Sequence, residues 1–515
     1  MSITFEENLC KCLENLKVGN FRAATSDLYP ISKQTPRLGN ASDDICCKFV
    51  NQMIGVLDVL KDKIGGSNKV EMEDARFFLM DAYRIMRTSC AANSQVQDEF
   101  GGVQGSKVME CTRIVLDAAT QHYEGESLIQ LLAVGIQFLA NLATNSEKNQ
   151  DLVWDHFHMQ FKGWLDMTKG EPEVVQERST KVLNITSFLI EACLPRQWQR
   201  NPRFLEEPVN WAVMVSAIQA NTTWKLEFGK KCLAKLAQVP GLMKAVMAEG
   251  QLGHMERACM LTSMQDVVTE WRDADEKGPV VPSLQNNLQF LIEYLVNNRA
   301  VLAANQLEMR EASFNAEMHL HVKMLETLAQ ASCCIAFSPD ISNFTVQKDE
   351  EPKTLIMYAI GLLMDIHKKG QEGVNMLSMT NRQLDVDINH PAFMLRRDLV
   401  RIIGNLSYQN KNSQDAVREA YGKIGIPLLF DHTKLDERNP YIGEWAKLAL
   451  TNLVRDNEDN AKFVKNLKLV GHVDPLGILK DCGLTLETQG EKIIVKSDGQ
   501  TPTLSKLSEK TPPRP

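Results

Sequence analysis

The stretch IIGNLSYQNKNSQDAV, residues 402–417, places an asparagine inside an apolar run and follows it with a polar break before the apolar pattern returns. Nearly the same arrangement recurs as FLANLATNSEKNQDLV at 138–153 and as ALTNLVRDNEDNAKFV at 449–464. A phrase repeated in this way indicates a repeated structural unit. Each copy has a leucine directly after its asparagine, which is Asn141, Asn405 or Asn452.

The apolar residues around these asparagines recur at helical spacing. Leu395, Leu399, Ile402 and Leu406 are three or four positions apart, which lays one apolar stripe along a helix. The polar break after each asparagine predicts the corner between one repeat and the next. The residues expected to cap the helix that follows are Ser146, Asn149, Asn412 and Asn460.

Residues 413–454 contain residues that typically end and begin helices, at the positions expected for a three-helix unit. Gly422 and Gly425 can adopt the left-handed backbone that ends a short helix, and Pro427 suits the first turn of the next. Asn439-Pro440 predicts a helix cap followed by a first-turn proline. The segment therefore parses as a short helix, a glycine-rich corner, a second helix, a loop and a long third helix, as in an armadillo repeat.

The distances between copies support a repeat array. Asn405 and Asn452 are 47 residues apart, inside the period of about 40–47 residues that armadillo and HEAT repeats show. Asn141 and Asn405 are 264 residues apart, which equals six steps of 44. A weaker copy at 83–100 has Thr88 in place of the asparagine. We predict an all-α, armadillo/HEAT-like α-solenoid.

Four segments are expected from changes in sequence character. Residues 1–190 form N-terminal armadillo-like repeats, 191–389 form degenerate helical repeats with loop insertions, 390–470 form a C-terminal armadillo domain, and 471–515 form a hairpin and a Pro-rich disordered tail. The hairpin is predicted at 484–497, turning at Gln489-Gly490. Interrupting loops are predicted from their Pro, Gly and charge content at 196–209, 272–283 and 338–353.

Composition excludes several protein classes. The chain has 44% hydrophobic and 24% charged residues, which is typical of a folded soluble protein. Its net charge of −8 argues against nucleic acid as the main partner. Residues 128–143 are apolar but shorter than the roughly 20 residues of a membrane span. Twelve scattered cysteines without a C-x-x-C pair favour reduced thiols and a cytoplasmic protein.

The segment 399–464 resembles the C-terminal signature domain of the ataxin-10 family. The motif R-x-x-G-N-L-x-Y-x-N-K stands at 401–411, G-I-P-L-L-x-D at 425–431, and N-P-[YF]-x-x-E-W at 439–445. Residues 135–154 and 490–497 are also similar to the family, so the resemblance covers most of the chain and is weakest at 160–390.

The resemblance implies a cytoplasmic armadillo-like scaffold without catalytic activity. Family members are associated with neurite outgrowth through Ras–MAP kinase signalling, with cytokinesis, and with centrosome or cilium-base complexes. The implied partners are a G-protein β subunit and the O-GlcNAc transferase, together with self-association through the C-terminal domain. The implied locations are the cytoplasm, the perinuclear region, the centrosome or cilium base, and the midbody.

Asn405, Arg401 and Arg397 form a polar line along one helix at intervals of four residues. Third helices line the groove of armadillo arrays, where asparagine can bond to the backbone of an extended peptide and arginine can bind carboxylates. We therefore predict a partner-binding groove. Alternatively, Asn405 satisfies the backbone of the neighbouring repeat. The groove candidates are Arg397, Arg401, Asn405, Asn452 and Asn141.

A receptor for basic peptides, such as a nuclear-import receptor, is one alternative function. Such receptors place a tryptophan four residues before each groove asparagine to hold lysine by cation–π contact. Here those positions are Gln137, Arg401 and Leu448. The tryptophan ladder is missing, and Arg401 would repel a basic peptide.

Copper handling is a second alternative, because residues 254–264 place soft sulfur ligands at helical spacing in the pairs Met255/Cys259 and Met260/Met264. Buried helices use these residues more often for packing. The sequence contains no H-E-x-x-H, G-x-S-x-G or phosphate-loop motif. We predict no catalytic residues, no cofactor and no metal.

Overall fold

The structure is a computed structural model. It describes residues 2–34, 42–61, 63–64, 69–121, 126–166, 173–201, 203–208, 211–220, 227–248, 250–273, 282–298, 316–334, 338–348, 351–371, 391–434, 439, 441–467, 484–489 and 492–497. The chain divides into two compact units, unit 1 (Met1–Val267 with Val281–Phe290) and unit 2 (Val268–Val280 with Leu291–Pro515). Each is described by itself.

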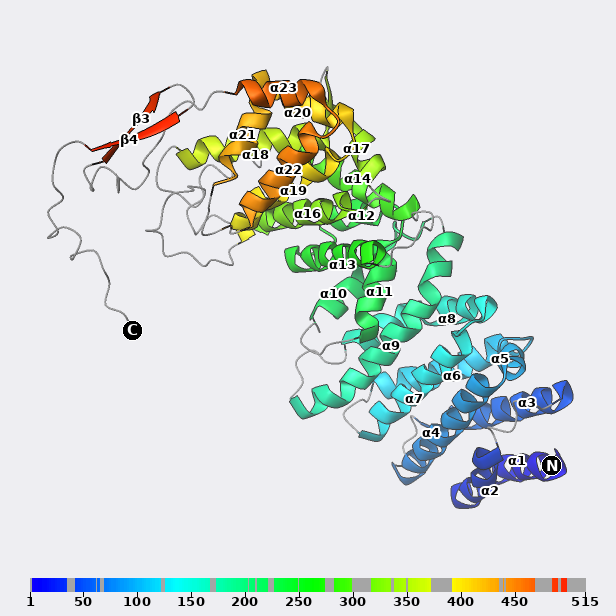
Figure 1. Cartoon of the computed structure of the whole chain (residues 1–515). Coiled ribbons are helices and arrows are strands. Elements are labelled where there is room, and N and C mark those ends of the chain that lie inside the picture. Colours follow the sequence, from blue (N-terminus) through cyan, green and yellow to red (C-terminus); the bar gives the residue numbers. More distant parts are fainter. Residues whose placement is uncertain are drawn as a thin grey trace, which may run out of the picture. The chain divides into compact units, whose positions relative to one another are not determined.

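Unit 1 is an all-α array. Its long helices α2, α4, α7, α9 and α11 pack in succession, each against the next, and α4, α7 and α9 are seen side by side in Figure 1. The helices are α1 (Ser2–Lys17), α2 (Phe21–Gln34), α3 (Asp43–Leu60), α4 (Lys69–Ala92), α5 (Ser94–Phe100), α6 (Gly105–Gln121), α7 (Glu126–Ala143), α8 (Glu147–Asp166), α9 (Glu173–Arg200), α10 (Ala212–Ala220), α11 (Glu227–Ala237), α12 (Leu242–Met247) and, shared with unit 2, α13 (His254–Asp273) and α14 (Pro282–Asn297).

Helix α7 explains why the segment around Asn141 is so apolar. It is the one helix of the described residues that is long and apolar enough to cross a membrane, with a mean hydropathy of 1.4. However, 72% of it is buried inside the protein. It packs against α4, α6, α8 and α9, so burial on several sides accounts for its composition.

Unit 2 repeats the arrangement with three long helices, α16, α19 and α22, in succession. Its elements are α16 (Ala316–Ser332), α17 (Ser338–Asn343), β1 (Thr345–Lys348), β2 (Glu351–Thr354), α18 (Leu355–Gln371), α19 (Pro391–Leu406), α20 (Lys411–Lys423), α21 (Gly425–Asp431), α22 (Ile442–Val454), α23 (Glu458–Asn466), β3 (Leu484–Gln489) and β4 (Lys492–Ser497). The all-α, armadillo-like prediction is confirmed, with α20, α21 and α22 forming the three-helix unit expected at 413–454.

The two glycines of the corner have different roles. Gly422 has φ of 73°, the left-handed backbone expected at a helix end. Gly425 is needed for space, because a Cβ there would lie 2.2 Å from the carbonyl oxygen of Val417. This close approach lets α21 begin directly after α20.

Matching side-chain networks close one corner in each unit. The Gln97 amide donates to the carbonyls of Asn141, Leu142 and Thr144, and the Gln414 amide donates to those of Ser407, Asn452 and Arg455. These carbonyls end helices and would otherwise lack partners. Asn149 and Asn460, both fully buried, add bonds to Leu142 and Leu453.

These networks correct the predicted helix caps. Asn410 and Asn457 cap α20 and α23 by accepting the N–H groups of Ser413 and Asn460, so Asn412 and Asn460 are not the caps. Asn149 likewise bonds to carbonyls of the preceding helix. A buried side-chain amide can donate hydrogen bonds to carbonyls that water cannot reach. Asn149 and Asn460 have this role and do not cap the helix that follows. The cap expected at Asn439 is also wrong, because α22 begins at Ile442 with Tyr441 at the cap position.

Two predicted loops contain regular structure. Residues 196–200 continue α9, because Gln197 bonds to Asp151 of α8 and Arg200 pairs with the same carboxylate. These tertiary contacts extend the helix beyond the internal Pro195. Residues 338–353 include α17 and an antiparallel β1–β2 hairpin, with Thr345 opposite Thr354. In the predicted loop 272–283, residues 274–281 lie outside the described residues.

The predicted C-terminal hairpin is present. β3 and β4 are antiparallel, with Leu484 opposite Ser497 and Gln489 opposite Lys492. The tail at 498–515 lies outside the described residues. The division into segments at 190, 390 and 470 stays a prediction, since it rests on sequence character.

Candidate functional site: the third-helix faces

The predicted groove asparagines bond to the preceding long helix. Asn141 Nδ2 donates to the carbonyl of Arg87 at 3.0 Å, and Asn452 Nδ2 donates to that of Gly404 at 2.9 Å. Asn405 Nδ2 lies 3.0 Å from Ser332 Oγ and 2.9 Å from Cys333 Sγ, at the end of α16. These contacts match the alternative in which asparagine satisfies the neighbouring repeat. We call the surface formed by successive long helices the third-helix face.

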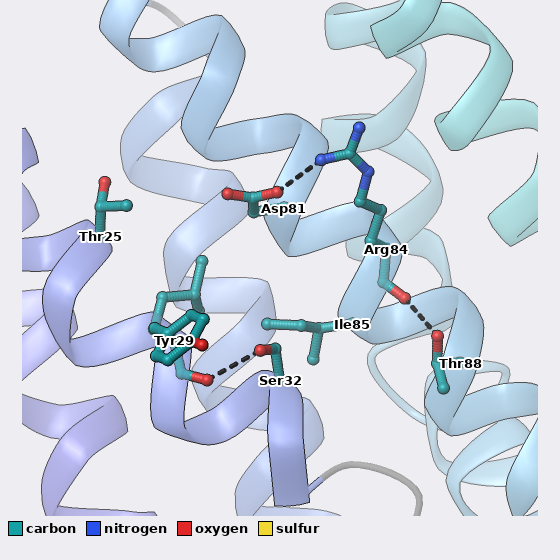
Figure 2. Close-up of a pocket in the computed structure, with 8 residues that line it drawn as sticks. Thr25, Tyr29, Ser32, Asp81, Arg84, Ile85 and Thr88 are labelled. Carbon is teal, nitrogen blue, oxygen red and sulfur yellow. Dashed lines mark hydrogen bonds and ion pairs between the residues drawn. The ribbon is translucent and has the colours of Figure 1, made fainter.

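Thr88, at the asparagine position of the weaker copy, does not reach the preceding helix. Its hydroxyl donates to the carbonyl of Arg84 on its own helix at 2.8 Å. A cavity of about 330 Å³ lies between α2 and α4 at this point, and Figure 2 shows most of its lining. Asp81 and Arg84 form a 2.7 Å ion pair there. The lining residues are Thr25, Leu28, Tyr29, Ser32, Asp81, Arg84, Ile85 and Thr88.

Unit 2 carries a cluster of arginines on its third-helix face. The buried carboxylate of Asp398 accepts from Arg397 at 3.0 Å and from Arg401 at 3.1 Å. The Arg401 guanidinium also lies 5.0 Å from the ring centroid of Trp445 on α22. Arg272 at the end of α13 and Arg401 both donate to Gln330 Oε1, at 3.2 and 3.4 Å. We call Arg272, Arg397, Arg401, Gln330 and Trp445 the arginine cluster.

The charged groups of α16 and α19 form pairs beside the cluster. Lys323 lies 2.9 Å from Glu326 on α16, and Arg397 and Arg401 bind Asp398 on α19. Burial raises the pKa of Asp398, and the attraction of Arg397 and Arg401 opposes that shift. The Arg401 Nε atom is buried and has no hydrogen-bond partner among the described residues.

The sequence-predicted site residues thus divide into two groups. Arg397, Arg401 and Asn405 do lie together on α19, whereas Asn452 and Asn141 serve contacts in other places. Sequence reasoning missed Arg272, Gln330 and Trp445. Trp445 stands seven residues before Asn452, so a search at four residues does not find it. Its signals were the motif ending in E-W and its helical spacing with Tyr441 and Leu448.

The sulfur pairs proposed for copper do not share a surface. Met255 is 55% exposed and Cys259 is partly exposed, whereas Met260 and Met264 are fully buried. Within the part of the chain that the structure describes, no group of three or more His, Cys, Asp or Glu side chains is placed to hold a metal ion. Packing accounts for the buried pair.

Two histidines lie against each other between α18 and α21. The rings of His367 and His432 have centroids 5.5 Å apart, and His367 Nε2 is 3.6 Å from a carboxylate oxygen of Asp431. His432 is fully buried, with Nδ1 2.7 Å from the carbonyl oxygen of Leu428. Burial lowers the pKa of His367, and it lowers the pKa of His432 from 6.5 to about 4.

Acid should therefore loosen this part of unit 2. Because the folded pKa of His432 lies below its unfolded value, the unfolded state binds more protons, and stability is lost as the pH falls from about 6.5 towards 4. We expect a loss of about 2 kcal/mol by pH 5. Hydrogen exchange of α21 amides between pH 7 and 5 measures it. In His432→Asn the protection of the α21 amides should depend less on pH than in the wild type, whereas His156→Asn should behave like the wild type. The same pH dependence in His432→Asn and the wild type would contradict the prediction.

Comparison with solved structures returns helical-repeat proteins at low similarity. The crystal structure of Kap121p is 11% identical, with a TM-score of 0.34, covering 92% of this chain and 53% of that chain. The SYS-1/POP-1 complex is 10% identical, with a TM-score of 0.27, covering 84% and 68%. The fold assignment rests on the helix packing described above.

Comparison with sequences is more specific. The family model described as the spinocerebellar ataxia type 10 protein domain matches residues 395–496, which include most of α19 and all of α20 to α23. Human ataxin-10 is 26% identical over 430 residues, covering 82% of this chain and 83% of its own. An ataxin-10 homologue of Dictyostelium discoideum is 37% identical over 107 residues, covering 21% and 17%. With the signature motifs placed on one helical repeat and relatives aligned along most of its length, the chain belongs to the ataxin-10 family.

Proposed function

We propose that the protein is a non-enzymatic scaffold that binds partner polypeptides on the third-helix face of unit 2, at Arg397, Arg401 and Asn405. The observation that carries the proposal is the arginine cluster beside two exposed apolar side chains, Tyr441 at the N-cap of α22 and Leu448 within α22. Tyr441 is 70% exposed and Leu448 is 44% exposed, one turn to either side of Trp445. Apolar anchors next to arginine and tryptophan are typical of protein-binding surfaces.

The partners proposed from family resemblance are a G-protein β subunit, the O-GlcNAc transferase and further copies of the chain. The setting proposed with them is cytoplasmic, in Ras–MAP kinase signalling, neurite outgrowth, cytokinesis and complexes at the centrosome or cilium base. Asn141 and Asn452 support this function indirectly, because they hold successive long helices in register. Asn405 adds a contact to the end of α16.

Direct binding of purified partners tests the proposal. We expect the G-protein β subunit or the O-GlcNAc transferase to bind the full chain, and Leu448→Glu to weaken that binding at least tenfold. Leu448 is chosen because Arg401 and Asn405 also hold the fold, whereas Leu448 is substantially exposed. Val103→Glu in unit 1, at a fully exposed valine, is the matched control and should bind like wild type.

Binding that is equal in Leu448→Glu and wild type would place the partner surface elsewhere. If the wild-type chain binds neither the G-protein β subunit nor the O-GlcNAc transferase, these proposed partners are wrong. Circular dichroism and hydrogen exchange of α22 should be unchanged in Leu448→Glu, which excludes unfolding as the reason for a lost interaction.

A further inference from the structure

We propose that the cavity between α2 and α4 binds the indole side chain of a tryptophan from a partner polypeptide, with the Asp81 carboxylate accepting the indole N–H. This cavity lies in unit 1, whereas the proposed function uses the third-helix face of unit 2. The two proposals concern different residues, so either one can fail without the other.

The cavity lies where the repeat pattern is broken. In two other copies the asparagine donates to a main-chain carbonyl of the preceding long helix, at 3.0 Å for Asn141 and at 2.9 Å for Asn452. Thr88 stands at this position of α4 and donates to the Arg84 carbonyl of its own helix (Figure 2). The side chain at position 88 therefore does not bridge to α2, and a cavity of about 330 Å³ remains between the two helices.

The size and the walls of the cavity match one aromatic side chain. Pockets for drug-sized ligands have volumes of about 300–1,000 Å³, so this cavity is at the lower end of the range and fits a single ring system. Leu28 and Ile85 line it and are only 2% and 3% exposed, whereas Thr25, Tyr29 and Ser32 are exposed. The inner wall is therefore apolar and the opening is polar.

The serine and threonine hydroxyls of the cavity can accept hydrogen bonds but have no hydrogen left to donate. Thr25, Ser32 and Thr88 each donate to a main-chain carbonyl of their own helix, at 2.9, 2.7 and 2.8 Å. The bonds of Ser32 and Thr88 are drawn in Figure 2. Because a hydroxyl has a single hydrogen, these three oxygens present only lone pairs to a ligand.

The charges around the cavity favour a neutral ligand. Asp81 and Arg84 are the charged side chains that line it among those the structure describes, and they form a 2.7 Å ion pair. Asp27 on α2 and Arg87 on α4 are hydrogen-bonded to side chains of α1 and α7, and neither lines the cavity. A cationic ligand would meet Arg84, and an anionic ligand would meet Asp81.

Asp81 provides the acceptor for a donating ligand. Its Oδ1 accepts from Arg84, and its Oδ2 makes no hydrogen bond within the described part of the chain. The indole of tryptophan is neutral and aromatic and has an N–H donor without an acceptor, which matches hydroxyl oxygens that only accept. A phenylalanine ring would leave the carboxylate unused. Tryptophan is also among the residues enriched at the energetic centres of protein interfaces.

Ligand-observed fluorine NMR on the full chain tests the proposal. The probe is N-acetyl-5-fluorotryptophan amide, whose fluorine line should broaden when the protein is added. Its 1-methylindole derivative cannot donate from nitrogen and should bind at least about threefold more weakly, because one hydrogen bond is lost. N-acetyl-4-fluorophenylalanine amide is smaller and has no donor. It should also bind at least about threefold more weakly, which excludes a clash of the added methyl group as the reason.

Protein variants locate the site. Asp81→Leu removes the acceptor at similar volume and should weaken binding of the tryptophan probe at least about threefold without weakening that of the phenylalanine probe. Asp117→Leu is the matched control, because Asp117 also pairs with an arginine of its own helix, Arg113 on α6, and does not line the cavity. It should bind the probe like the wild type. Thr88→Phe should fill the cavity and abolish binding of both probes while its circular dichroism spectrum stays that of the wild type.

Several outcomes would overturn the proposal. These are a probe line that stays sharp with the wild-type chain, equal binding of the tryptophan probe and its 1-methyl derivative, equal effects of Asp81→Leu and Asp117→Leu, or displacement of the probe by N-acetyl-lysine amide. Loss of probe binding in Leu448→Glu would place the tryptophan on unit 2 and would also overturn it. If Leu448→Glu loses the partner proteins but keeps the probe, both proposals stand as separate surfaces.

Discussion

Asp398→Ala is expected to destabilise unit 2 by about 3–5 kcal/mol, because it leaves two arginines without their counter-ion. Asp398 is fully buried, and the side chain of Arg401 is only 9% exposed. Removing the carboxylate also removes the acceptor for Arg397. A buried guanidinium without a carboxylate retains its desolvation cost and loses the attraction that offset it. Urea unfolding, followed by hydrogen exchange in α19, measures the loss.

Two further variants separate charge from packing at this position. Asp398→Leu combined with Arg401→Met removes both charges and should recover part of the stability, since a buried ion pair can be replaced by apolar groups at little cost. Glu419→Ala is the control, because this exposed carboxylate forms a surface ion pair with Arg418, which water and salt screen, and its loss should leave the urea midpoint close to that of the wild type. Equal urea midpoints for Asp398→Ala and Glu419→Ala would contradict the prediction.

The repeated phrase predicted the architecture because its signals are local. Helical spacing of Leu395, Leu399 and Leu406 requires only the neighbouring residues of one helix, and all three are buried in the structure. The corner at Gly422 is similarly local, because it consists of three consecutive residues with positive φ, Tyr421, Gly422 and Lys423, of which only the glycine favours that backbone. These features were confirmed where the prediction placed them, in α19 to α22.

The partners of polar residues could not be predicted in the same way. Asn405 bonds to Ser332 and Cys333, more than 70 residues earlier, and the segment between them includes the unexpected β1–β2 hairpin. Nothing in the spacing around Asn405 states which distant helix lies beside it. The same limit explains why Trp445 was not expected against Arg401.

The structure gives the family motif a physical meaning. In R-x-x-G-N-L, Arg401 pairs with Asp398, Gly404 lets α22 approach, Asn405 bonds to the end of α16, and Leu406 is buried in the core. These six residues therefore provide an ion pair within α19 and the contacts of α19 with the long helices on both sides of it. The motif describes helix packing first, and only Arg401 and Asn405 are candidates for a role in binding.

Gly404→Val is expected to destabilise unit 2 by about 3 kcal/mol, because α19 and α22 are packed directly against each other at this glycine. A Cβ at position 404 would lie 3.0 Å from the Cβ and 3.1 Å from the Cα of Ala449. The second distance is to backbone, which cannot rotate away, so the helices would have to separate. Separation would also lengthen the 2.9 Å bond from Asn452 to the Gly404 carbonyl.

Gly163→Val is the matched control for this substitution. Gly163 is exposed on α8, and the nearest atom to a Cβ there is Thr120 Cγ2 at 3.8 Å. Both changes gain the same small helix propensity, on the order of 0.5 kcal/mol, so their difference isolates the packing cost. Gly404→Ala should cost less than Gly404→Val, and adding Ala449→Gly should recover only part of that loss, because the backbone of residue 449 would still crowd the added methyl group. Equal urea midpoints for Gly404→Val and Gly163→Val would show that the two helices can move apart freely, and the interface would then not depend on this glycine.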